Sequence, residues 1–112
     1  MTEHTRYRDC PAFETKDGSE IRELMHPDRH GNDHQSLAEA RVAPGQSTIL
    51  HRHRTSEELY HVTAGRGEMT LDGERFEIGP GDIAGVHPGG SHGLKNTGTE
   101  DIHFIVVSVK PA

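Results

Sequence analysis

Short runs of alternating apolar and polar residues, separated by glycine and proline, limit the fold of this 112-residue chain more than any other feature. No segment of ten or more residues keeps a 3.6-residue apolar period without a glycine or proline, so no long amphipathic helix is expected. Short strands with turn signals between them are typical of a small barrel or sandwich. The pattern predicts an all-β fold, with strands at 19–25, 37–43, 48–53, 57–63, 67–72, 74–78, 82–86, 92–96 and 102–109.

Turn-forming residues divide these strands and separate them from the first part of the chain. Asp72-Gly73 lies between two predicted strands and is a strong signal for a two-residue hairpin. Residues 1–18 are expected to be loosely structured, and the polar run 26–34 is expected to be a loop. We therefore predict an N-terminal extension over 1–35, with one short strand and a His-rich loop, followed by a barrel over 36–112.

The apolar residues are few, but they are patterned. Leu, Ile, Val and Phe total 21 residues, close to the level at which disorder occurs. The last predicted strand is apolar on both faces and needs a cover on each, which predicts a homodimer with the outer face against a partner subunit. The predicted core comprises Val42, Ile49, Leu59, Val62, Leu71, Phe76, Ile78, Ile83 and the run 102–109.

Charge and cysteine content exclude several classes of protein. Twelve Lys and Arg against 18 Asp and Glu give a net charge of −6, which argues against a nucleic-acid partner. The longest apolar run, 104–107, is far shorter than the roughly 20 residues of a membrane helix, and the N-terminus lacks the apolar centre of a signal peptide. Cys10 is the single cysteine, which excludes an intramolecular disulfide and a multi-cysteine zinc site. A cytoplasmic protein is expected.

Histidines are abundant, ten in all, and some of them have the spacing of metal ligands. His51 and His53 are two residues apart, so both project to the same face of a strand. Glu58 begins the next predicted strand, and His92 opens a later one. Three imidazoles and one carboxylate suit a divalent ion of iron, manganese, nickel, cobalt or zinc. Octahedral coordination would leave positions open for water, substrate or dioxygen, as in a catalytic site.

The residues around these histidines resemble the two motifs of the cupin family. The first motif is matched at every fixed position, by Gly45, His51, His53, Glu58 and Gly65. The second is matched at four of its five positions, by Gly81, Gly89, His92 and Asn96, with His87 where the family usually has proline. Asn96 is not a metal ligand in the family.

The resemblance implies a double-stranded β-helix, a jelly-roll barrel, with one divalent metal held by His51, His53, Glu58 and His92. Cupins include dioxygenases, isomerases, decarboxylases and lyases, so the family leaves the reaction open. We expect a metal-dependent enzyme that acts on a small oxygenated or carboxylated molecule. The alternatives are a non-catalytic cupin that binds or senses a small molecule, and a barrel whose metal is purely structural.

Two further residues are candidates for proton transfer. Tyr60 would point into the barrel beside the metal, either as a general base or as a packed core tyrosine. His87 is either a proton shuttle at the mouth or a histidine of a surface turn. His61 and His103 are expected to face away from the lumen, whose lining is predicted to include Tyr60, Ile49, Val62 and Leu94 and to suit a small ligand.

His26, His30 and His34 are spaced by four, which on a helix would align them as metal ligands. Pro27 and Gly31 argue against such a helix, so a solvated loop is predicted rather than a second metal site. The pattern around Arg41 leaves two directions open for its side chain, either into the barrel toward an anionic substrate or outward.

Overall fold

The computed structural model describes residues 3–16, 18–48 and 55–109, and the backbone alone of residues 51–52. Within these residues nearly all regular structure is β-strand, apart from a short 3-10 turn, η1 (Tyr7–Asp9), and a one-turn helix, α1 (Pro27–His30). The strands are β1 (Ala12–Glu14), β2 (Glu20–Met25), β3 (Gln35–Val42), β4 (His51–Arg52), β5 (Glu57–Ala64), β6 (Gly67–Leu71), β7 (Glu74–Ile78), β8 (Ile83–Val86), β9 (Ser91–Lys95) and β10 (Ile102–Val109).

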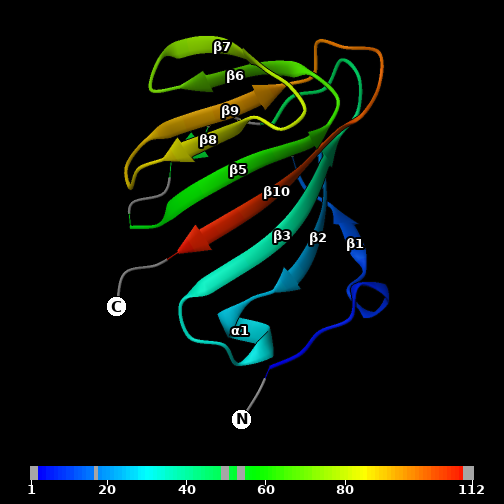
Figure 1. Ribbon diagram of the computed structural model, residues 1–112, viewed down its shortest axis with the longest axis vertical. Helices are drawn as coiled ribbons and strands as arrows, with labels where there is room; N and C mark the ends of the chain where they lie inside the picture. The colour runs from blue at the N-terminus through cyan, green and yellow to red at the C-terminus, as the bar shows by residue number, and fades with distance from the viewer. Residues whose placement is uncertain (1–2, 17, 49–50, 53–54, 110–112) are drawn as a thin grey trace.

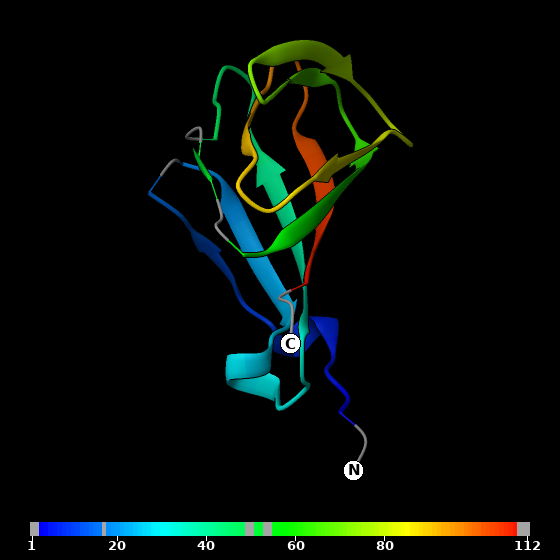
Figure 2. The ribbon, with the colours of Figure 1, turned by 90° about the vertical axis from the view of Figure 1, so that its left-hand side faces the viewer.

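The strands form two antiparallel sheets that curve around a common interior (Figures 1 and 2). One sheet has the order β1-β2-β3-β10-β5-β8, and the other has the order β4-β9-β6-β7. In the six-stranded sheet β10 lies between β3 and β5, so strands distant in the sequence are neighbours in space. The predicted all-β jelly-roll fold is confirmed.

The core lies between the two sheets, and the inward residues of each strand alternate with outward ones. Val42, Val62 and Ile78 are buried, as predicted, and so are Ile102 and Phe104 from the run 102–109. Ile78 comes from the four-stranded sheet, which also contributes Met69 and Leu94.

The hairpin between β6 and β7 turns at Asp72-Gly73, as predicted. Both residues have positive φ, 49° and 84°, which is the backbone conformation of a type I′ turn.

Three predicted core residues are wrong, because they lie on an outer face or at a sheet edge. Leu59 and Ile83 are 46% and 65% exposed. Both face outward, since the alternation that buries Tyr60 turns the residues beside it away. Phe76 is 38% exposed because β7 is the edge strand of its sheet. Ile49 lies outside the described residues.

The N-terminal segment is more ordered than predicted. β1 pairs with β2, with Phe13 opposite Ile21, so the lead-in over 1–18 is not wholly loose. β2 pairs with β3 and thereby joins the six-stranded sheet.

The prediction of a loop throughout 26–34 is also wrong, because α1 forms there at the end of the molecule remote from the β6–β7 hairpin (Figure 1). Proline is compatible with the first position of a helix, where no amide donor is needed, and Pro27 occupies that position. Gly31, with a φ of 82°, ends the helix.

Arg41 faces outward, which answers the question its sequence pattern left open. Its guanidinium lies 2.9 Å from the carboxylate of Asp101 and 2.6 Å from that of Glu20. The hydrogen bonds to Asp101 and Glu20 raise the pKa of Arg41. His61 is exposed and His103 is half-buried on the same side of the sheet, and neither lines the cavity described below. No helix among the described residues has the length and apolar character needed to cross a membrane.

Candidate metal centre

Two of the predicted metal ligands, Glu58 and His92, meet in the interior although 34 residues separate them in the sequence. Glu58 is the second residue of β5 and His92 the second of β9, so each sheet supplies one of the pair. His92 Nε2 lies 3.2 Å from Glu58 Oε1. Both residues are buried, with 0% and 7% of their surface exposed. The structure therefore brings an imidazole and a carboxylate to one point inside the barrel.

The strands on both sides of β9 fix the position of His92. In the sheet register His92 is opposite Leu71 of β6 and opposite His51 of β4. The other ring nitrogen, Nδ1, lies 3.5 Å from the carbonyl oxygen of Gly90. In the tautomer with a proton on Nδ1, the nitrogen that faces Glu58 keeps its lone pair, as a metal ligand requires.

His51 and His53 can be placed only in part. The backbone of His51 is paired with that of His92 across β4 and β9, which puts His51 at a register position next to the Glu58–His92 pair. The side chain of His51 and the whole of His53 lie outside the described residues. Among the side chains that are described, no three His, Cys, Asp or Glu residues form a metal-binding group. Glu58 and His92 fit a divalent metal, and the four-ligand set remains a prediction.

Tyr60 packs against both the candidate centre and the core. Its ring meets the His92 ring edge to face, with 5.4 Å between centroids and an interplanar angle of 72°. On its other side it stacks on Phe104 at 5.4 Å and 16°. Tyr60 is 7% exposed and lines the cavity. The inward direction predicted from its place two residues after Glu58 is confirmed.

Two further residues at motif positions, His87 and Asn96, lie away from the Glu58–His92 pair. His87 is exposed in the turn between β8 and β9, where its carbonyl oxygen accepts a hydrogen bond from the Gly90 amide. It is not among the described residues that line the cavity, so the structure does not bring it together with Tyr60. Asn96 is buried, and its side chain bonds to the backbone of Val42, Gly98 and Glu100.

A cavity of about 360 Å³ opens beside Glu58 and Tyr60. Its floor is the inner face of the six-stranded sheet, and it continues onto β1 and β2. The cavity residues from this N-terminal segment were not predicted as a lining; they are Phe13, Ser19, Ile21 and Glu23. The alternation of Ile21 and Glu23 with Arg22 was the available signal, because it gives both residues one face. Val62 and Leu94, predicted for the lumen, are buried but do not line this cavity.

Comparison with known proteins assigns this architecture to a family. The family model described as the cupin domain matches residues 38–108. The chain belongs to the cupin family. The matched region includes Glu58 and His92 but not β1 and β2. The part of the cavity lined by β1 and β2 therefore lies outside the region that the family model matches.

Relatives of this cupin include proteins with quite different names. It is 45% identical over 107 residues to an uncharacterized protein of Methanocaldococcus jannaschii, covering 96% of this chain and 86% of that one. It is 30% identical over 90 residues to the oxalate-binding protein of Thermotoga maritima, covering 80% and 74% of the two chains.

Solved structures show the same fold. A "predicted oxalate decarboxylase" from Thermotoga maritima superposes with a TM-score of 0.86 at 24% identity, covering 96% of this chain and 99% of that one. The polyketide cyclase RemF from Streptomyces resistomycificus superposes with a TM-score of 0.80 at 26% identity, covering 100% and 83%. These names span different chemistries, so similarity supports the barrel and not one reaction.

Proposed function

We propose that this cupin holds one divalent first-row metal through His51, His53, Glu58 and His92, and acts on a small oxygenated or carboxylated molecule in the adjoining cavity. The observation that carries the proposal is the buried pair of Glu58 and His92, 3.2 Å apart, with Glu58 on the cavity wall. A carboxylate and an imidazole are ligands that iron, manganese, nickel, cobalt and zinc all accept. Such a metal supplies Lewis acidity or, for iron and manganese, redox chemistry.

The residues around the pair define what the protein itself contributes. The cavity walls are largely apolar and contain a few polar groups, which is the usual composition of a small-molecule site. Tyr60 is held between His92 and Phe104, so its hydroxyl has a fixed position from which to donate a hydrogen bond or transfer a proton. We propose Tyr60 as the residue that moves this proton. His87 would act only at the surface.

A binding or sensing cupin is the second candidate, and the oxalate-binding name of the Thermotoga maritima relative favours it. It needs the same barrel and metal but no positioned acid or base. Replacing Tyr60 with Phe separates the two functions, because it removes the hydroxyl and keeps the packed ring. An enzyme would lose turnover of its substrate and keep its metal, whereas a binder would show no turnover in either form.

We also propose that the protein is a homodimer, with the outer face of the six-stranded sheet as the interface. An apolar row crosses three strands on that face, because Val107 of β10 is opposite Leu37 of β3 on one side and opposite Leu59 of β5 on the other. A two-fold interface places the same surface of each subunit against its copy, and an apolar row is complementary to itself.

The metal site is tested by the metal content of untagged protein, measured by elemental analysis after incubation with each candidate ion. We expect about one metal per chain in the wild type and a loss of at least about tenfold in His92→Ala, because a ligand is removed. His61→Ala is the matched control, since His61 is exposed, and it should keep its metal. Full metal content in His92→Ala, or none in the wild type, would overturn the proposal.

A further inference from the structure

The inner face of the six-stranded sheet places a second carboxylate in the same cavity. Glu23 of β2 is opposite Ala38 of β3, Ala38 is opposite Val106 of β10, and Val106 is opposite Tyr60 of β5. Adjacent strands are about 4.8 Å apart, and three such spacings lie between Glu23 and Tyr60. The distance between their backbones measured along the sheet is therefore about 14 Å. Both residues line the cavity. Glu23 and the candidate metal centre therefore lie at opposite ends of one floor.

The floor between the two ends is made of small side chains. Ala38 and Val106 occupy the row between Glu23 and Tyr60, and Ser36 and Ser108 occupy the parallel row that leads to Glu58. All four line the cavity. Because these residues are short, a ligand can lie along the floor and reach both ends. A cavity of about 360 Å³ has room for roughly a dozen waters at about 30 Å³ each, and so for a ligand larger than oxalate.

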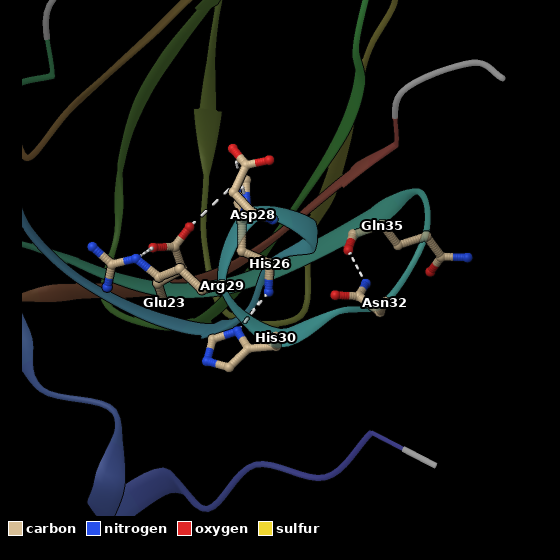
Figure 3. Close-up of polar contacts among 7 residues, drawn as sticks. All are labelled: Glu23, His26, Asp28, Arg29, His30, Asn32 and Gln35. Atoms are coloured by element: carbon tan, nitrogen blue, oxygen red, sulfur yellow. Dashed lines mark hydrogen bonds and ion pairs between the residues drawn. The ribbon is translucent and has the colours of Figure 1, made fainter. Parts of the chain in front are cut away.

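Glu23 lies beside α1 and its N-cap residue, His26 (Figure 3). Its Oε2 lies 3.6 Å from Arg29 Nε, and its Oε1 lies 3.7 Å from His26 Nε2. His26 in turn accepts a hydrogen bond from the Asp28 amide at the start of the helix. Both distances from Glu23 exceed that of a hydrogen bond, so its oxygens are still able to accept donors.

We propose that Glu23 is a specificity-determining residue, which accepts a hydrogen bond from a hydroxyl or ammonium group at the far end of the ligand. The proposal rests on the function proposed above, since the near end of the ligand is taken to be a carboxylate at the metal centre. A second carboxylate at the far end would meet the charge of Glu23 and be rejected. The substrate class is thus a monocarboxylate that carries a hydrogen-bond donor several atoms away, rather than a dicarboxylate of the same length.

The test uses three series of probes with the full-length, metal-loaded protein. The series are ω-hydroxy monocarboxylates, ω-amino monocarboxylates and α,ω-dicarboxylates beginning with oxalate, each from two to ten carbons so that the longer probes reach both ends of the floor, with affinity measured by calorimetry. We expect a donor-bearing probe of one length to bind at least about tenfold more tightly than the dicarboxylate of that length, since a hydrogen bond to a charged group contributes that much or more. The hydroxy and amino series show which donor is preferred.

Variants then assign the preference to Glu23. Glu23→Gln keeps the shape and removes the charge, so the preference over dicarboxylates should fall about tenfold while metal content stays at the wild-type level. Glu77→Gln, on the exposed face of β7, is the matched control and should change neither. An unchanged preference in Glu23→Gln overturns the inference, as does a wild type that holds its metal but prefers dicarboxylates. A wild type without metal instead overturns the proposed function.

Discussion

Asn96 shows how one buried motif residue can hold a turn without taking part in the candidate centre. Its amide nitrogen donates to the carbonyl oxygens of Val42 at 2.9 Å and Glu100 at 2.7 Å, and its oxygen accepts from the Gly98 amide at 2.9 Å. With 1% of its surface exposed, no water can replace these bonds. The motif position that Asn96 matches is thus explained by backbone bonding in the loop between β9 and β10.

We predict that Asn96→Ala lowers the free energy of unfolding by about 2 to 4 kcal/mol, because buried backbone groups lose their partners. Asn96→Asp should be at least as destabilising, since a carboxylate cannot donate to either carbonyl. Urea denaturation measures both. Asn32→Ala is the control, since Asn32 is only partly buried and donates to a single carbonyl near the surface, and it should cost less than about 1 kcal/mol. Equal effects at the two positions would contradict this account.

The residues of β5 show what the sequence alone could predict at this scale. The two-residue period gave Glu58 and Tyr60 one face, and the structure buries both. The same period turns Leu59 outward, but its apolar character suggested the core. Side-chain chemistry misled there because the outer face of the sheet carries a row of apolar residues across three strands, which the sequence of one strand cannot reveal.

At the scale of elements, β6 depends on a close approach that only glycine allows. A Cβ on Gly67 would lie 2.4 Å from the Lys95 carbonyl oxygen and 2.6 Å from Ile102 Cδ1. β6 pairs with β9 along its length, and Leu71 in it is opposite His92. The packing of β6 against β9 is therefore linked to the position of a candidate ligand.

We expect Gly67→Ala to destabilise the fold by about 1 to 3 kcal/mol, because β9 must shift to admit the methyl group. Gly85→Ala is a matched change in an exposed strand position, where the new Cβ would meet only Leu59 Cδ2 at 3.6 Å. It should be neutral or slightly stabilising. Thermal unfolding measures both, and a Gly67→Ala protein as stable as the wild type would show that the β6–β9 approach can relax freely.

The N-terminal elements were the least predictable part of the fold. β1 has three residues, and it is a strand because it forms backbone hydrogen bonds with β2. The sequence of so short a segment does not indicate that pairing. α1 forms where Pro27 and Gly31 suggested a loop, because these residues fit the first and the terminating position of a single helical turn. The part of the cavity wall formed by β1 and β2 could not be predicted either, because its residues come together only when these strands pair with each other and with β3.

At the scale of the whole molecule, the outer face of the six-stranded sheet carries the test of the homodimer. We predict a mass of twice 12.4 kDa for the wild type by light scattering, and 12.4 kDa for Leu59→Asp, because a charge in the apolar row opposes its burial. Phe76→Asp is the control, since Phe76 is similarly exposed at the edge of the other sheet. A wild type of 12.4 kDa, or a dimeric Leu59→Asp protein, would refute the interface.

The central place of β10 has a consequence for how the protein is made. β10 pairs with β3 on one side and with β5 on the other, so it alone joins the two halves of the six-stranded sheet. A ribosome delivers residues 102–109 after every other described strand, and pairings between distant segments form slowly. Until then Glu23 and Glu58 belong to separate, unjoined parts of the nascent chain. The cavity that unites them is completed only when β10 has been made and has paired with both β3 and β5, so a chain that stops before residue 102 lacks the joined site.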